Sequence, residues 1–328
     1  MMLTVGQERS PLIEIDGGDK IWTVTFTANG EYIVGGGASG LRVWRVKDGK
    51  QMTSMAARGT WCLAVSRDGR WIAAGTFNGY SIVWDAKTFE KVFTHKENGY
   101  DISGVDFSPD STRLLTAPQN RTASVWDVEA RKKVLTLDHE DWVRAAKYSL
   151  QGGRIATATS KSVRVWDSND ARLLVEIPVT AIPLFSNGLL WSNKHLFVVS
   201  DSTIKQLEAS TGSTVSEWLV TSSDYVSCVA LPQHVNREFI AHSTNDTVTF
   251  LDTSTHIRIG LIQHTQTIRS IALSPDNRFL AINGNSGKIA IKDLSDVSPA
   301  SYSTVSIVHC RIIAYHNDFY CQSTLLHS

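Results

Sequence analysis

The side chains best suited to metal chemistry gather near the C-terminus of the chain. His309, Cys310, His316 and Cys321 carry the imidazole and thiolate groups that bind zinc. Their spacing matches no common zinc pattern, and the other two cysteines lie far away in the sequence without a CxxC pairing. We therefore expect no metal site and no disulfide framework, and this cysteine usage favours a reducing compartment.

Motifs for nucleophilic or phosphate chemistry are also missing from the sequence. It contains no GxSxG or HExxH, and the glycines of GGGASG (35–40) are followed by neither a helix nor the lysine that phosphate binding needs. The ten histidines are scattered along the chain. We predict a protein that is not an enzyme and that needs no cofactor.

A short aromatic motif recurs along the chain and sets its organisation. VWR or VWD ends an apolar run four times, with tryptophans at 44, 84, 126 and 166, an interval of about 41 residues. Weaker copies without tryptophan follow at 204–208, 248–252 and 289–293. The sequence therefore consists of seven repeats, which a single repeat architecture can accommodate in one body.

The charge balance and the apolar runs exclude some classes of partner. Lysine plus arginine equals aspartate plus glutamate, at 32 each, so no net field draws the chain to nucleic acid or to an anionic membrane. The N-terminal segment lacks the features of a signal peptide, and no apolar run approaches the ~20 residues of a membrane span. We expect a soluble, cytoplasmic protein, with the nucleus as an alternative location.

One repeat has the pattern of a small antiparallel sheet. Residues 142–177 read as alternating apolar segments (WVRAAKYS, RIATA, VRVWD, LLVEI) separated by polar turns, which is typical of four short strands. A sheet this small cannot bury both faces alone, so neighbouring sheets must stack on it. Seven such sheets predict a radial all-β arrangement.

These residues resemble the WD-repeat β-propeller family over roughly 11–293. Besides the Trp-Asp endings, FSPD (107–110) and LSPD (273–276) occupy turns, and Asp138-His139 and Gln263-His264 stand where the family usually has Gly-His. The resemblance implies a seven-bladed β-propeller of four-stranded antiparallel blades. It also implies that the four motif tryptophans pack between blades as core.

The polar network of the family is incomplete in this sequence. That network joins the Gly-His histidine, a serine or threonine, a turn aspartate and the tryptophan. At the aspartate position, five blades have asparagine or serine instead, and one has aspartate. These residues are Asn78, Asn120, Ser160, Asp201, Asn245 and Ser286. We expect no blade with the complete set, although Asn and Ser still suit the turn.

A closed ring needs its last blade completed by one end of the chain. Otherwise an open sheet edge remains exposed. We predict that Leu12 to Ile15 supplies the outer strand beside Lys288 to Asp293, after an N-terminal tail of residues 1–10, in a propeller over 11–293. The C-terminal extension, 294–328, contains TVSIV and RIIAY and could take that edge instead, so it is either a loose tail or an added strand.

The binding candidates come from positions that form one rim of the ring in the family. These positions flank the first apolar residue of each inner strand or precede the turn aspartate. Carrying them over gives Lys20, Trp22, Trp61, Phe77, Asp101, Gln119, Trp142, Arg144, Tyr225, Thr267 and Arg269, with Phe185 as a further candidate in the irregular fifth blade.

Aromatic and arginine side chains dominate interface energetics, so a rim rich in them predicts a partner. Packing of Trp22, Trp61 and Trp142 within the channel or between blades is the simpler alternative. Trp71, Trp191 and Trp218 are expected in the core or at blade edges.

We therefore predict a non-enzymatic scaffold that binds a partner protein or peptide on this rim, as a monomeric subunit of a larger complex. A reader of modified or cationic peptide tails, using an aromatic cage with Asp101, is the alternative. A hydrolase that joins acids of distant blades at the central channel is less favoured.

Overall fold

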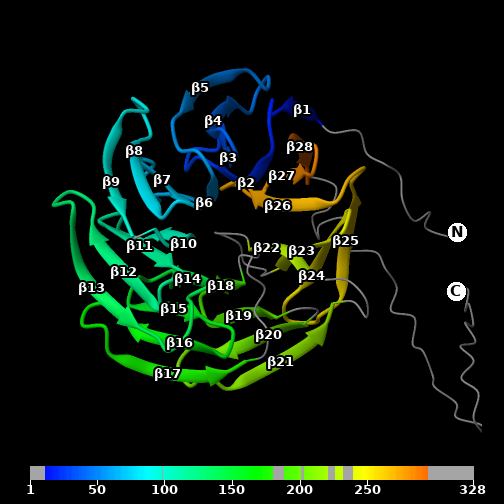
Figure 1. The fold of residues 1–328 in the computed structure, drawn as a ribbon. Coiled ribbons are helices and arrows are strands. Elements are labelled where there is room, and N and C mark those ends of the chain that lie inside the picture. The colour runs from blue at the N-terminus through cyan, green and yellow to red at the C-terminus, as the bar shows by residue number, and fades with distance from the viewer. Residues whose placement is uncertain are drawn as a thin grey trace, which may run out of the picture.

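The computed structural model describes residues 12–97, 99–179, 188–200, 203–220, 226–231 and 239–294, and the structural statements that follow are confined to them. Seven four-stranded antiparallel sheets stand around one axis (Figure 1). The all-β, seven-bladed propeller expected from the repeats is confirmed.

The first three blades follow one another in sequence. Blade 1 comprises β2 (Ile21–Phe26), β3 (Tyr32–Gly37), β4 (Gly40–Arg45) and β5 (Gln51–Met55). Blade 2 comprises β6 (Thr60–Val65), β7 (Trp71–Thr76), β8 (Tyr80–Asp85) and β9 (Lys91–Lys96). Blade 3 comprises β10 (Ile102–Phe107), β11 (Arg113–Pro118), β12 (Thr122–Asp127) and β13 (Lys132–Asp138).

The remaining blades repeat the plan, and the last one uses both ends of the ring. Blade 4 comprises β14 (Ala145–Tyr148), β15 (Arg154–Ala158), β16 (Ser162–Asp167) and β17 (Leu173–Pro178). Blade 5 comprises β18 (Leu189–Trp191), β19 (His195–Ser200), β20 (Thr203–Glu208) and β21 (Thr214–Leu219). Blade 6 comprises β22 (Val226–Ala230), β23 (Phe239–Thr244), β24 (Thr247–Asp252) and β25 (Arg258–Gln263). Blade 7 comprises β26 (Ile268–Leu273), β27 (Phe279–Gly284), β28 (Lys288–Asp293) and β1 (Ile13–Asp16).

Closure of the ring is made by the N-terminal strand, as predicted. β1 pairs antiparallel with β28, with Ile13 opposite Ile291 and Asp16 opposite Lys288. Ile15 is 2% exposed and joins a core cluster shared by blades 1 and 7. The strand starts one residue later than expected, but the register covers the edge of blade 7, which removes an open edge.

The second and third strands of the blades carry the core. Burial is almost continuous along second strands such as β7, and third strands such as β12 are buried at four of six residues, whereas outer strands such as β9 have only exposed and half-buried residues. The four motif tryptophans, Trp44, Trp84, Trp126 and Trp166, are 1%, 2%, 5% and 7% exposed. Trp71 and Trp191 are also buried, and Trp218 is half-buried on β21. These placements agree with the core or edge positions expected from the sequence.

Three of the four network members connect in blade 4. His139 Nε2 lies 2.8 Å from Thr157 Oγ1, and the Trp166 indole N–H donates to the same oxygen at 2.7 Å. The ring Nδ1 of His139 lies 2.9 Å from the carbonyl oxygen of Leu137, which takes the place of the missing aspartate. Burial lowers the pKa of His139 to about 4, so the ring is neutral at pH 7 and suits both contacts.

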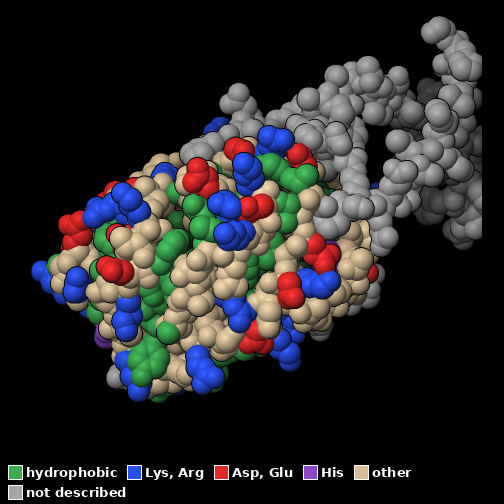
Figure 2. Space-filling model, turned by 90° about the horizontal axis from the view of Figure 1, so that it is seen from above, with side chains coloured by type: hydrophobic (Ala, Val, Ile, Leu, Met, Phe, Trp, Pro, Cys, Tyr) green, Lys and Arg blue, Asp and Glu red, His purple; other side chains and the backbone are tan. Residues whose placement is uncertain are grey.

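The outer surface of the ring mixes charges of both signs. On the side that carries β1 and β5, lysine and arginine side chains alternate with acidic ones over a tan and green surface (Figure 2). Single ion pairs such as Arg45 with Asp48, at 2.5 Å, lie in solvent-exposed turns and contribute little stability. The overall charge balance thus also holds locally on this side.

Candidate functional site

The candidate site lies on one face of the ring, here called the aromatic rim. This rim is formed by the turns that lead into the first strands and by the turns between second and third strands. A chain of backbone hydrogen bonds links blades 1 and 2 here: Ala38 N–H to Lys20 O at 3.1 Å, Gly59 N–H to Ala38 O at 3.1 Å and Phe77 N–H to Gly59 O at 3.0 Å. The turns of adjacent blades therefore hold one another in place.

A β-bulge near the start of the first strand sets the direction of key side chains. In blades 1, 2 and 7 the register with the second strand shifts by one residue there. The extra residue is Trp22, Trp61 and Arg269, respectively. A bulge commonly re-aims a side chain out of the regular ladder. These three residues were candidates from the sequence, whereas the corresponding bulges of blades 3 and 6 have Ser103 and Ser227, which were not.

Trp22, Trp61 and Phe77 form a cluster of three rings, here called the aromatic cluster. The ring centroids lie 5.9 Å apart for Trp22 and Trp61, 5.1 Å for Trp22 and Phe77 and 4.5 Å for Trp61 and Phe77, with interplanar angles of 57°, 66° and 45°. Each of the three residues is half-buried. Tilted and edge-to-face pairs of this kind stabilise one another by about 0.5–1.5 kcal/mol. The cluster is both packed and partly open to solvent.

Tyr100 extends this surface toward blade 3 and was not among the candidates. Its side chain is 47% exposed. Gly79, in the turn after Phe77, has a positive φ of 75° and stands so close to Tyr100 that a Cβ there would lie 2.7 Å from the Tyr100 carbonyl oxygen. The glycine thus permits the β7–β8 turn to touch the segment that leads into β10. Tyr100 stands two residues before the first apolar residue of its strand, one position outside the pattern that we carried over.

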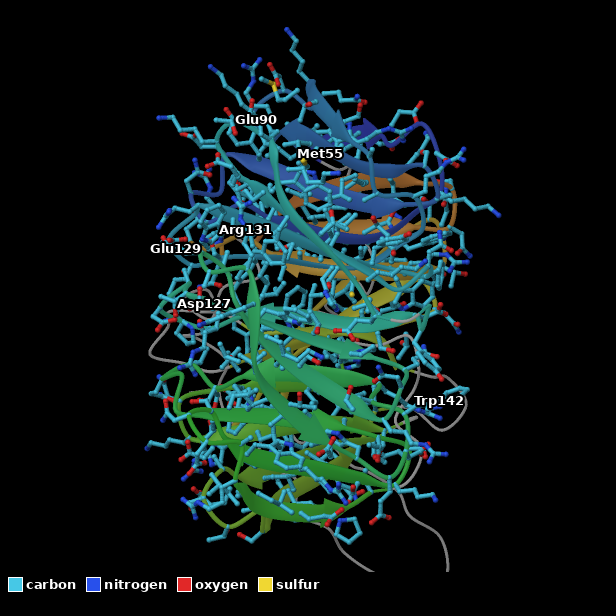
Figure 3. The ribbon with its side chains drawn as sticks, turned by 60° about the vertical axis from the view of Figure 1, so that its left-hand side comes forward. Met55, Glu90, Asp127, Glu129, Arg131 and Trp142 are labelled. Carbon is cyan, nitrogen blue, oxygen red and sulfur yellow. The ribbon has the colours of Figure 1, made fainter. Side chains whose placement is uncertain are left out.

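Trp142 lies on the same rim at blade 4 and is 48% exposed. Figure 3 shows it at the opposite edge of the ring from Asp127, Glu129 and Arg131. Its backbone N–H donates to Asp141 Oδ1 at 2.8 Å, and Ser160 donates to the other carboxylate oxygen. Mainly because of the Ser160 hydrogen bond, the pKa of Asp141 is lowered. The strand β14 begins only at Ala145, so Trp142 precedes it in a fixed loop.

The other candidates line the rim at separate points. Lys20 and Thr267 are exposed, and Arg144 and Gln119 are half-buried. The Gln119 N–H donates to the Asp101 carbonyl oxygen at 2.9 Å, and burial raises the pKa of the Asp101 carboxyl group.

The remaining candidates are Arg269, Tyr225 and Phe185. The Arg269 guanidinium donates to Asn285 Oδ1. Tyr225 and Phe185 lie outside the described residues.

The described part of the chain contains neither a cluster of metal-binding side chains nor a helix suited to span a membrane. There, no group of three or more histidine, cysteine, aspartate or glutamate residues is placed to hold a metal ion. The C-terminal histidines and cysteines considered above fall outside the described residues. Within the same described ranges, no helix has the length and apolar character to cross a bilayer.

Comparisons with known proteins agree with this architecture. Residues 49–85, 87–127, 131–167 and 254–291 match the family model described as WD domain, G-beta repeat. A WD repeat-containing protein of Deinococcus radiodurans is 32% identical over 124 residues, which is 34% of this chain and 47% of that protein. Serine-threonine kinase receptor-associated protein of Gallus gallus is 28% identical over 138 residues, covering 37% of this chain and 38% of that protein. The matches thus span less than half of either relative.

Solved structures share the fold at lower identity. The WD40 repeats of RRP9 superpose with a TM-score of 0.72 at 17% identity, covering 84% of this chain and 94% of that one. The β-propeller domain of Cps50 (Swd1) from Myceliophteria thermophila gives 0.74 at 16% identity, covering 86% and 98%. The chain belongs to the WD-repeat β-propeller family. Members of this family generally serve as non-enzymatic scaffolds for protein interaction.

Proposed function

We propose that the aromatic rim binds a protein or peptide partner, and that the aromatic cluster is the centre of the contact. The observation that carries this proposal is three mutually packed rings, two of them on β-bulges, that remain partly open to solvent. Tryptophan and tyrosine are enriched among the residues that dominate binding energy at interfaces. Tyr100 and Trp142, both about half exposed, would enlarge the contact toward blades 3 and 4.

The cluster suits an apolar side chain better than a cationic one. A cation binds over a ring face within about 6 Å of the centroid. Trp61 and Phe77 are only 4.5 Å apart, centroid to centroid, so no ammonium group fits between them. Rigid, pre-packed rings instead offer a surface on which an aliphatic or aromatic side chain of the partner loses its water at little entropic cost. We therefore rank a reader of cationic tails second.

The test is capture of partners from a lysate of the source cells with the intact protein and with a Trp61→Ala, Trp142→Ala double variant. Leu219→Ala is the matched control, because Leu219 is 63% exposed on the outer strand of blade 5. All proteins must first show cooperative melting. We expect a partner that the intact protein and the control retain and the double variant loses. Equal capture by the double variant would refute the proposal.

We also propose an intracellular location. Cys62 and Cys228 are free thiols, and burial raises the pKa of each to about 12. Such thiols are unreactive and compatible with a reducing compartment. Fractionation of source cells with an antibody to this chain tests the location, and recovery from the culture medium would contradict it.

A further inference from the structure

The opposite face of the ring, formed by the turns between first and second strands and between third and fourth strands, carries an irregularity at blade 5. In blades 1–4 and 7 the turn from first to second strand spans five residues: 27–31, 66–70, 108–112, 149–153 and 274–278. In blade 5 the turn is 192–194 and has only three residues. The corresponding turn of blade 6 falls mostly outside the described residues.

The five-residue turns touch one another from blade to blade. The Asp68 N–H of blade 2 donates to Ser111 Oγ of blade 3 at 3.2 Å. Gly152 of blade 4 stands against the ring of Pro109 in blade 3, where a Cβ would lie 3.3 Å from the proline Cδ. Long turns therefore cover the grooves between these blades. The shorter turn of blade 5 reaches less far and leaves the groove between blades 4 and 5 open.

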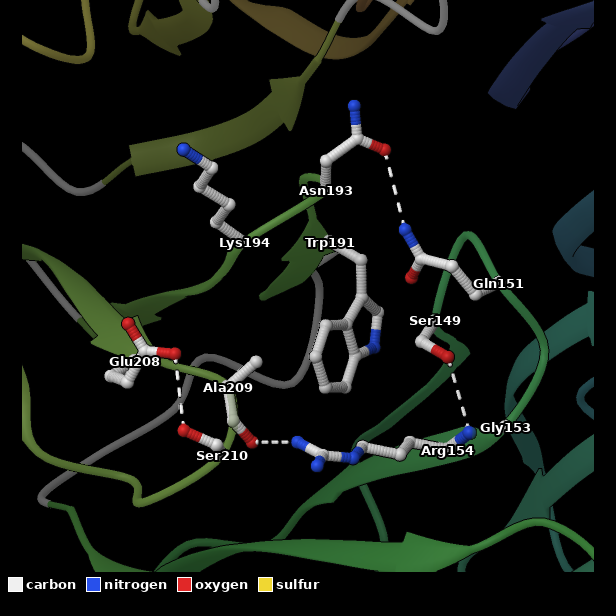
Figure 4. Close-up of a pocket in the computed structure, with 10 residues that line it drawn as sticks. All are labelled: Ser149, Gln151, Gly153, Arg154, Trp191, Asn193, Lys194, Glu208, Ala209 and Ser210. Carbon is white, nitrogen blue, oxygen red and sulfur yellow. Dashed lines mark hydrogen bonds between the residues drawn. The ribbon is translucent and has the colours of Figure 1, made fainter.

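An open cleft of about 410 Å³ lies at this position, between blades 4 and 5 (Figure 4). Its walls are the 149–153 turn, the 192–194 turn and residues 208–210 at the end of β20 and in the turn that follows. The indole ring of Trp191 lies between these walls, with its six-membered ring toward Ala209. Its N–H donates to the Lys147 carbonyl oxygen at 3.2 Å, so the nitrogen is already satisfied. Trp191, which is 7% exposed, and Ala209 thus supply the apolar part of a lining that is otherwise mostly polar or charged.

Positive charge prevails around this apolar surface. The Arg154 guanidinium donates to the Ala209 carbonyl oxygen across the cleft and is held there. Lys194 is exposed, and its ammonium group has no ion-pair partner among the described residues. The single carboxylate in the lining is that of Glu208, which accepts a hydrogen bond from Ser210 at 3.2 Å. The two cations outnumber the one acid.

We propose that this cleft is a second docking site, which takes an acidic–apolar segment of a partner protein. One apolar side chain of the segment would pack on Trp191 and Ala209, and an adjacent carboxylate would face Arg154 and Lys194. The volume lies in the range of sites that enclose a small ligand or an anchoring side chain. This inference is independent of the aromatic rim, because the two sites lie on opposite faces of the ring.

The probe is a labelled, amidated pentapeptide with a central phenylalanine flanked by glutamates, and its counterpart with lysines in place of the glutamates. Binding to the full chain is measured by fluorescence anisotropy. We expect the glutamate peptide to bind at least tenfold more tightly than the lysine peptide. Trp61→Ala should leave this binding unchanged, which separates failure at this site from failure at the aromatic rim.

Two variants locate the binding in the cleft. A Cβ at Gly153 meets no atom within 4 Å and the residue does not adopt a left-handed φ, so Gly153→Trp fills the cleft without strain. Lys194→Glu reverses one charge, and Lys87→Glu, at an exposed lysine of the turn after β8, is its matched control.

Both cleft variants should weaken the glutamate peptide at least tenfold, and the control should stay within twofold. Equal binding of the two peptides, no binding of the glutamate peptide at millimolar concentration, or unchanged binding by Gly153→Trp would overturn the proposal.

Discussion

The molecule uses tryptophan in two regions with opposite consequences. Trp44 and Trp166, on third strands, are 1% and 7% exposed and lie between blades. Trp22 and Trp61, on the bulges of first strands, are half-buried on the aromatic rim, and Trp142, on the same rim at blade 4, is 48% exposed. The position within the repeat, rather than the residue type, decides whether an indole ring packs between blades or lies partly open to solvent at the rim.

The strand environment explains this difference. A third strand is paired on both edges, and its inward-facing residues, including the motif tryptophans, are buried between neighbouring blades. The start of a first strand lies at the rim, where a bulge turns one side chain outward. Substitutions at the two kinds of position should therefore differ in how much they lower the free energy of unfolding.

The largest expected effect is that of a third-strand tryptophan. Trp166→Ala should lower the free energy of unfolding by about 3–5 kcal/mol, because it leaves a cavity between blades. Trp166→Phe keeps most of the ring but loses the 2.7 Å hydrogen bond to Thr157, and should cost about 1–2 kcal/mol. Urea denaturation followed by circular dichroism measures both values. A loss below about 1 kcal/mol for the alanine variant would remove the contrast with the rim.

The next effect is the pH dependence of stability that comes from His139, which contacts the same Thr157 oxygen as Trp166. Burial lowers the pKa of His139 to about 4, against about 6.5 in an unfolded chain. The unfolded chain therefore takes up a proton first as the pH falls. The contribution of the neutral His139 ring to the free energy of unfolding is complete above about pH 6.5. It decreases toward pH 4, by up to about 3 kcal/mol.

The matched variants are His139→Gln and His242→Gln. Burial also lowers the pKa of His242 to about 4, so both histidines contribute to the same pH window. Each substitution should make the melting temperature less sensitive to pH between 6.5 and 4. An unchanged slope for His139→Gln would show that its imidazole is not held neutral in the fold.

A rim tryptophan inside the aromatic cluster should have a smaller effect on stability. Trp61→Ala loses ring contacts to Trp22 and Phe77, worth about 1–2 kcal/mol together, and leaves no buried cavity. Denaturation under the same conditions as for Trp166→Ala gives a direct ratio. A loss as large as that of Trp166→Ala would make the aromatic cluster a part of the core.

The smallest effect is expected at Trp142, which is the most exposed of the rim tryptophans. Trp142→Ala should change the free energy of unfolding by no more than about 0.5 kcal/mol, as is usual for surface substitutions. The same denaturation series measures it. A larger loss would show that the loop before β14 depends on this side chain.

Much of the fold was predictable because it depends on period and alternation. The 41-residue interval gave seven blades, and the strand-like segment before the first repeat indicated β1 as the closing strand. Local patterns of this kind appear directly in the residue types.

The details of the site were less accessible from the sequence. The candidates Trp22 and Trp61 were identified, but their contact with Phe77 depends on bulges and turn geometry that leave no mark in residue types. The carbonyl oxygen of Leu137 completes the hydrogen bonds of His139, and a backbone group cannot be recognised from sequence. The cleft at blade 5 results from a turn shortened by two residues, and only the three-dimensional neighbours show what that shortening uncovers.

Oxidative footprinting of the tryptophans with and without the captured partner tests the central claim most directly. Hydroxyl radicals label accessible indole rings, and mass spectrometry of the digest quantifies each one. We expect Trp22, Trp61 and Trp142 to be labelled in the free protein and protected in the complex, while Trp44 and Trp166 stay unlabelled in both. Equal labelling of the rim tryptophans in the free and bound states would contradict it.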